Sequence, residues 1–224
     1  MCSSIGCLKD FLPIWLPLQK LFVFDLVTPV CYDSVIPDLP LISKNGITGT
    51  WFPALNNKAT TTYTFSPTAG LCAIPTTLEI EVIVLPLVIA TPNKTSVCSN
   101  TAPSIAISSD IIGATFSWTI EQTKVTGASS GSGNLINQVL NTVSNESGEA
   151  IYKVAATAYG CVGLINEVKI IVNPTADVIA TPDQETICSG QSTNIVLSSN
   201  VIGTTYNWTT SQNGVLGAFS STAN

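Results

Sequence analysis

The residues of this chain that could do chemistry are first its cysteines, seven among 224 residues that include no histidine. Thiols can attack substrates, bind metals or form disulfides. A cysteine nucleophile needs a basic partner, usually histidine, and a zinc site needs a close cluster of cysteine and histidine. Because the sequence offers neither, we expect disulfides, which are typical of an oxidising extracellular setting, with buried free thiols as the alternative. The seven are Cys2, Cys7, Cys31, Cys72, Cys98, Cys161 and Cys188.

Carboxylates are the second group with chemical potential, because several of them together could bind calcium. The sequence contains no D-x-D-x-D-G loop, the usual signature of such a site. Asp177 and Asp183 flank a joint between two segments, so they are the weak calcium candidates, and no other cofactor or metal is expected. The carboxylates considered are Asp110, Glu121, Glu146, Glu149, Asp177, Asp183 and Glu185.

Aromatic side chains could form a platform for stacking sugars, but their spacing favours a structural role. Three tryptophans each follow a cysteine by twenty residues, and two tyrosines each precede one by nine. A buried tryptophan beside a disulfide is typical of immunoglobulin-type cores, so we expect these five aromatics inside. The pairs are Cys31 with Trp51, Cys98 with Trp118, Cys188 with Trp208, Tyr63 with Cys72, and Tyr152 with Cys161.

The elements that must position these residues are repeated along the chain. Val88–Asn134 aligns without a gap on Val178–Asn224, with 21 of 47 positions identical. Both copies begin with "VIATP" and pass through a glycine turn to a tryptophan. Self-similarity at a fixed period indicates an array of structural units. Short alternating stretches separated by Gly and Asn predict strands of a β-sandwich.

The earlier part of the chain follows the same plan in shortened form. "TTYTFS" (61–66) and "TTLEIEVIV" (76–84) match "AIYKVAATA" (150–158) and "NEVKIIV" (166–172), and both pairs predict a closing hairpin. We therefore expect an all-β chain of tandem β-sandwich repeats, the last one truncated. The predicted segments are a leader or remnant at 1–21, a short repeat at 22–86, a full repeat at 87–174 and a truncated one at 175–224.

Placing the cysteines on these repeats suggests one pair in each complete repeat. This arrangement predicts the disulfides Cys31–Cys72 and Cys98–Cys161 and leaves Cys188 unpaired. Pairing between neighbouring repeats stays open, because sequence alone does not determine connectivity.

Composition narrows the class of protein. Only 10% of residues are charged and the net charge is −6, which argues against nucleic acid as a partner. The apolar stretch "FLPIWLPLQKLFVF" (11–24) is interrupted by two prolines and is too short to span a membrane, so no membrane-spanning segment is expected.

Two stretches of the sequence resemble known repeats of surface proteins. The stretch at 45–73, which includes "NGITGTWFPALNN", resembles bacterial Ig-like repeats in giant surface proteins of Bacteroidetes-type bacteria. "VIATPDQETICSGQSTNIVLSSNVIGTTYNWT" (178–209) is similar to PKD-like repeats in the same proteins. The resemblance implies an immunoglobulin-like sandwich, an extracellular or cell-surface location, and a role in adhesion or gliding motility with type IX secretion and no enzymatic activity.

Two functions remain open at this stage. The first is a stalk or spacer in a cell-surface adhesin, whose partners are the neighbouring repeats and surface glycans or proteins. The second is a carbohydrate- or protein-binding accessory module of a secreted hydrolase. An exposed aromatic or carboxylate cluster would favour the second.

Overall fold

The computed structural model describes residues 23–71 and 73–223. Within these residues the regular secondary structure consists of β-strands. The contacts divide the chain into two compact units, and each is described by itself below. One unit comprises residues up to Leu85 together with Tyr159–Cys161. The other comprises Pro86–Ala158 and the residues from Val162 onward. The predicted leader, 1–21, lies outside the described residues.

The N-terminal unit is built on a three-stranded antiparallel sheet in the order β2-β3-β4, with β1 paired in parallel to β5. Its core consists of alternate residues of β3, where Tyr63 and Phe65 are fully buried, together with Ile80. This alternation follows from the pleat, which turns successive side chains to opposite faces. The strands are β1 (Val30–Cys31), β2 (Gly49–Phe52), β3 (Thr61–Pro67), β4 (Thr76–Ile80) and β5 (Val82–Ile83).

Trp51 lies at the edge of this core and is only half-buried, so our expectation of a core residue is only partly right. Its ring packs against Phe24 and Phe65, with centroids 4.9 and 5.1 Å away. Its Nε1–H donates to the carbonyl oxygen of Pro40 at 3.0 Å. The small sheet is too narrow to enclose so large a side chain, and the polar edge of the indole stays near solvent.

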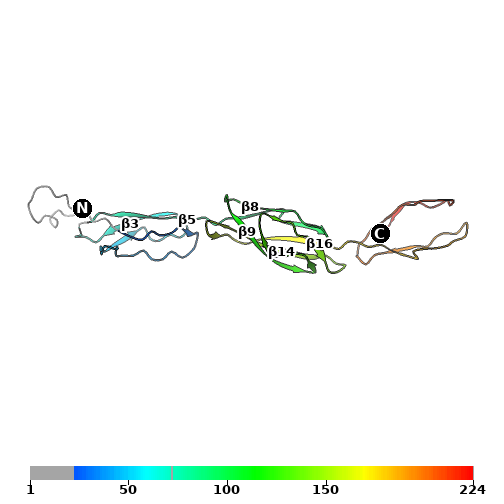
Figure 1. Cartoon of the computed structure of the whole chain (residues 1–224), viewed down its shortest axis with the longest axis horizontal. Helices are drawn as coiled ribbons and strands as arrows, with labels where there is room; N and C mark the ends of the chain where they lie inside the picture. The colour runs from blue at the N-terminus through cyan, green and yellow to red at the C-terminus, as the bar shows by residue number, and fades with distance from the viewer. Residues whose placement is uncertain (1–22, 72, 224) are drawn as a thin grey trace, which may run out of the picture. The chain divides into compact units, whose positions relative to one another are not determined.

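The second unit contains a two-sheet structure, here called the central sandwich (residues 86–173). One sheet has the order β11-β9-β14-β16-β7 with β15 attached to β14, and the other has the order β12-β8-β6. Figure 1 labels β8, β9, β14 and β16 of these two sheets. A separate β10–β13 pair completes it. The strands are β6 (Val88–Thr91), β7 (Lys94–Cys98), β8 (Ile105–Ser109), β9 (Thr115–Thr123), β10 (Val125–Thr126), β11 (Gly131–Ser132), β12 (Leu135–Ile136), β13 (Asn141–Thr142), β14 (Gly148–Ala158), β15 (Cys161–Val162) and β16 (Asn166–Asn173).

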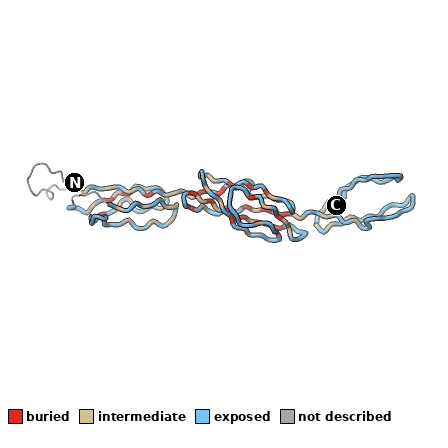
Figure 2. Tube along the Cα trace, in the orientation of Figure 1, coloured by how far each residue is buried: buried red, intermediate tan, exposed pale blue. Residues whose placement is uncertain are grey.

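Strand β14 forms the centre of the core. It pairs with β9 on one edge and with β16 on the other, and Tyr152 lies opposite both Ile120 and Val168. Buried and half-buried residues alternate along its whole length, as a strand with one face in a core requires. Figure 2 shows the buried residues concentrated on these strands. The cluster draws on both sheets and includes Trp118, 6% exposed.

Residues 174–223, the C-terminal segment, form two separate strand pairs. These are β17 (Ile179–Thr181) with β18 (Val196–Ser198), and β19 (Tyr206–Trp208) with β20 (Ser221–Ala223). No residue between 175 and 223 is buried, and Figure 2 draws this stretch almost entirely in pale blue.

Trp208 is 37% exposed, so its assignment to a core is wrong for this structure. The physical reason is the missing neighbour strand. Trp118 lies beside Val154 of β14, whereas within residues 175–223 the strand of Trp208 pairs only with β20.

The C-terminal segment nevertheless repeats the pairings of the central sandwich. In β6–β8, Ile89 lies opposite Ser108, and in β17–β18, Ile179 lies opposite Ser198. The indole Nε1–H of Trp118 donates to the carbonyl of Ser129 at 3.2 Å, and that of Trp208 donates to Phe219 at 3.2 Å. Every one of these positions is shifted by the ninety residues that separate the two similar sequences.

Replacing Trp118 by alanine should destabilise the central sandwich by about 3–5 kcal/mol, because the deletion leaves a large cavity in a packed core. The matched variant Trp208→Ala removes the equivalent but exposed side chain and should cost about 0.5 kcal/mol or less. Urea unfolding followed by circular dichroism measures both. Equal losses of stability would contradict the different environments of the two side chains.

Alkaline pH should destabilise the central sandwich through Tyr152. Burial raises the pKa of this hydroxyl to about 12, and the hydroxyl donates to Gln138 Oε1 at 2.9 Å. Above pH ~10 the unfolded chain loses this proton while the folded chain keeps it, so stability falls until pH ~12.

Tyr152→Phe tests this because phenylalanine cannot ionise. At pH 8 the variant should be less stable by about 1 kcal/mol, since it lacks the hydrogen bond. The deficit should shrink or reverse by pH 11, as measured by calorimetry with free thiols blocked. Tyr63→Phe, in the other unit, is the control and should leave the transition of the central sandwich unchanged. A pH-independent deficit for Tyr152→Phe would refute the titration.

Candidate functional site: the cysteine turns and the disulfide

The first cysteine turn follows β1. The carbonyl oxygen of Cys31 accepts hydrogen bonds from the backbone N–H of Ser34 at 3.0 Å and from Ser34 Oγ at 2.6 Å. Between them, Asp33 has φ of 62°, in the left-handed region that Asp tolerates better than most residues. The turn therefore ends the strand and presents the Cys31 side chain at its tip.

Cys98 and Cys188 occupy turns of the same design. After Cys98, Asn100 has φ of 64°, and the hydroxyl of Thr101 donates to the Cys98 carbonyl at 2.5 Å. After Cys188, Gly190 has φ of 85°, and the N–H of Gln191 donates to the Cys188 carbonyl at 3.0 Å. In all three turns the residue two after the cysteine is left-handed, and the residue three after it closes the turn.

Cys161 belongs to a different turn, the one that leaves β14. Tyr159 and Gly160 both have positive φ, 51° and 81°. The backbone N–H of Gly163 then donates to the carbonyl of Ala156 at 2.8 Å, which holds β15 against β14. Cys161 is 1% exposed.

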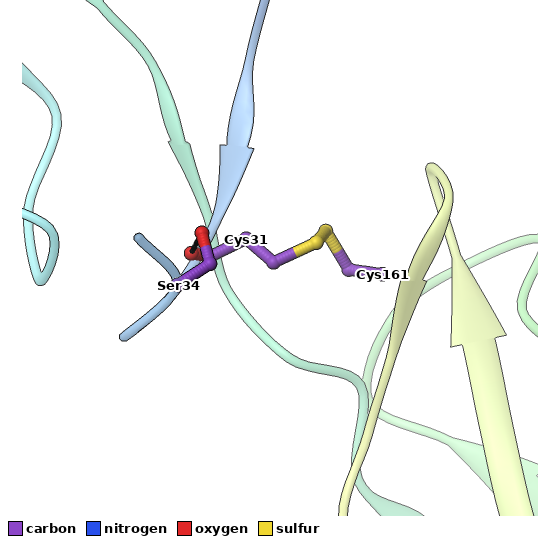
Figure 3. Close-up of a disulfide and its surroundings, with 3 residues drawn as sticks. All are labelled: Cys31, Ser34 and Cys161. Carbon is purple, nitrogen blue, oxygen red and sulfur yellow. Dashed lines mark hydrogen bonds between the residues drawn. A yellow bond between two sulfur atoms is a disulfide. The ribbon is translucent and has the colours of Figure 1, made fainter. Parts of the chain in front are cut away.

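Cys31 and Cys161 are joined by a disulfide, with their Cα atoms 5.5 Å apart and 130 residues between them in sequence (Figure 3). The figure shows the Cys31 side chain leaving the turn that Ser34 closes. On the chain-entropy account, closing a loop of this length stabilises the folded state by about 5 kcal/mol. The bond covalently joins β1 to the turn of the β14–β15 hairpin.

This bond corrects both predicted pairings, Cys31–Cys72 and Cys98–Cys161. Cys98 lies opposite Asn173 at the end of β16, whereas Cys161 precedes the beginning of that strand at Asn166. Seven residues of strand span roughly 23 Å, far beyond the ~7 Å limit between bridged Cα atoms. Cys98 is instead a free, exposed thiol, as is Cys188. Cys72, like Cys2 and Cys7, lies outside the described residues.

The two calcium candidates differ in their surroundings. The carboxylate of Asp177 accepts hydrogen bonds from Ser199 Oγ at 2.6 Å and from the backbone N–H and Nδ2 of Asn200 at 2.9 and 2.6 Å. These bonds, that of Ser199 above all, lower the pKa of Asp177. Asp183 is exposed. Across residues 23–71 and 73–223, no three or more Cys, Asp or Glu side chains come together as a metal site.

Asp177 has a structural counterpart rather than a partner for calcium. In the central sandwich Asp110, at the position of Asn200, accepts the backbone N–H of Leu87 at 2.9 Å. That bond is the main cause that lowers the pKa of Asp110. Both carboxylates therefore tie the beginning of one strand to the end of the strand that pairs with it, with donor and acceptor ends exchanged.

The C-terminal segment contains a cavity of about 470 Å³. Its lining is mainly apolar and includes two aromatic side chains, Tyr206 and Trp208. Three of the lining positions, shifted back by ninety residues, are Ile105, Ile107 and Trp118, which are buried in the central sandwich. The cavity thus corresponds to the interior of a sandwich that is open on one side. Its lining residues are Thr193, Ile195, Leu197, Tyr206, Trp208 and Ala223.

In the described residues, no helix is long and apolar enough to cross a membrane.

Comparison with known proteins identifies one family, in the central sandwich. No curated protein matches the chain. Residues 95–176 match the family of PKD-like domains, and this range contains nearly all strands of the central sandwich. The central sandwich is therefore a PKD-like domain, a type of module that usually has a structural or extracellular role.

Proposed function

We propose that this chain is a non-enzymatic segment of repeated β-sandwich modules that acts as a stalk or spacer in a secreted adhesive surface protein. The observation that carries the proposal is the ninety-residue shift between equivalent pairings. A tryptophan at the same place in each copy donates to the same carbonyl position at the same distance. A chain that builds one scaffold twice is suited to spanning distance rather than to forming a single site.

The proposed organisation follows the repeats. It comprises a segment outside the repeats at 1–21, a short Ig-like repeat at 22–86, a PKD-like repeat at 87–174, and a further PKD-like segment at 175–224. The PKD-like domain and the Cys31–Cys161 disulfide support an extracellular location. The bacterial cell surface, gliding motility and type IX secretion rest on the resemblance of the sequence alone.

The absence of enzymatic activity is part of this proposal, and the surroundings of the carboxylates support it. In the central sandwich three glutamates form separate ion pairs with lysines instead of gathering in one place. A solvent-exposed ion pair such as that of Glu146 contributes little to stability. The pairs are Glu121 with Lys153, Glu146 with Lys124, and Glu149 with Lys169.

A binding module for glycans is the second candidate, because the cavity of the C-terminal segment presents Tyr206 and Trp208. Aromatic faces can stack on sugars. However, the position of Trp208 is a core position in the central sandwich, where Trp118 is 6% exposed. The cavity is thus better explained as an uncovered interior. Loss of glycan binding on Trp208→Ala, with unchanged stability of the central sandwich, would favour this second candidate.

A spacer must withstand tension, and single-molecule stretching between the chain ends tests this. In the oxidised chain the tension passes from Cys31 directly to Cys161, so the 130-residue loop between them stays short. Reduction should release roughly 450 Å of additional contour length, at up to ~3.6 Å per residue. A force peak should accompany the release, because the β9–β14–β16 pairings must be broken.

The Cys31→Ser variant is the matched control and should show the long extension with or without reductant. Release of the loop at negligible force would argue against a mechanical role and would contradict the proposed spacer.

A further inference from the structure

Three cysteines of this chain have the same local geometry but not the same bonding. Cys31, Cys98 and Cys188 each begin a turn with a left-handed residue two positions later. Cys31 is bonded to Cys161, whereas the other two are free and exposed. Cys31 therefore shows that a cysteine in this turn can form a disulfide when a partner cysteine lies beside it.

The strand context of two of these cysteines is also the same. Cys31 ends β1, which pairs in parallel with β5, the last strand of the N-terminal unit. Cys98 ends β7, which pairs in parallel with β16, the last strand of the central sandwich. The equivalence of Cys31 and Cys98 therefore extends beyond the turn to the pairing of the strand that carries it.

The partner of Cys31 is the turn cysteine of a PKD-like domain. Cys98 cannot use that turn within its own domain, because the length of β16 separates it from Cys161. Its side chain is nevertheless presented at the tip of a turn, exposed to solvent. Cys161 of the same domain is therefore excluded as the partner of Cys98, so a turn cysteine that bonds Cys98 has to belong to another PKD-like module.

We propose that Cys98 and Cys188 are attachment sites for the β14–β15 turn cysteine of another PKD-like module, so that successive modules are linked by disulfides in series. In each link a cysteine that begins this left-handed turn in one module bonds the β14–β15 turn cysteine of another module. This inference rests on the repeat architecture proposed above. Because the two ends of the link differ, one module can form a link at each of its two cysteines, so that links can continue in series.

The linking reaction is thiol–disulfide exchange with a low-molecular-weight disulfide, such as oxidised glutathione, as the oxidant. The Cys98 thiolate attacks one sulfur of the oxidant and expels a thiolate, which forms a mixed disulfide. The thiolate of the turn cysteine then attacks the Cys98 sulfur and expels the second thiolate. Two protein thiols are oxidised, and one oxidant disulfide is reduced to two thiols.

The experiment uses the full chain, with a second copy supplying the turn cysteine. In a background with Cys2, Cys7, Cys72 and Cys188 replaced by serine, Cys31→Ser leaves Cys98 and Cys161 as the only thiols. Oxidised glutathione is added, and the linked peptides are mapped by mass spectrometry without reduction. Random pairing of two thiols would give about half mixed 98–161 links. We expect these links to exceed both symmetric links together by about threefold or more, in dimers and longer chains.

Two matched samples complete the design. Restoring Cys188 and replacing Cys98 by serine should move the mixed link to 188–161. The parent chain retains Cys31 and therefore keeps Cys161 in the Cys31–Cys161 disulfide. Its result does not depend on the folding of the Cys31→Ser variant. In a glutathione redox buffer, Cys98 of one copy should displace Cys31 in a fraction of these parent molecules, giving the same 98–161 link.

Symmetric 98–98 links at or above the level of mixed links, in both the variant and the exchange buffer, would overturn the inference. The readout reports only which sulfurs pair. It can therefore fail while the force measurement still supports a spacer, and the force measurement can fail while the links form.

Discussion

The structure depends on β14, which pairs with a neighbour strand at each edge and buries every second side chain in the core. This strand pairs with β9 and β16 and places Tyr152 and Val154 in the interior, while its odd-numbered residues stay half-buried. The opposite sheet covers the same interior with Ile105 and Ile107. In this arrangement Trp118 of β9 is buried. The C-terminal segment has equivalent strands without that neighbour, and its tryptophan is exposed.

The cysteines form a second level of organisation that depends on the first. The β14–β15 turn positions Cys161, because the Gly163 N–H to Ala156 carbonyl bond fixes the chain just beyond β14. Cys31 reaches it from a separate turn that ends β1. A small sandwich buries limited apolar surface, and a disulfide that closes a long loop adds stability through the unfolded chain. The bond thus supplements a core that is small for the length of the chain.

The proposed function depends on repetition rather than on a single site. The polar groups that could do chemistry are used structurally: carboxylates tie strand ends together or pair with lysines, and tryptophan indoles donate to loop carbonyls. The PKD-like domain at residues 95–176 is consistent with this use. A mechanical role requires paired strands and covalent links that resist tension. The described residues contain both.

The sequence by itself determined the features that are local or periodic: the all-β class and the alternation that buries Tyr63 and Tyr152. These follow from the two-residue period of a strand. Only the tertiary structure decided which sulfurs meet and whether Trp208 is covered. Disulfide pairing and burial depend on which strands lie beside a residue in space, and that proximity is not encoded in the spacing between residues along one repeat.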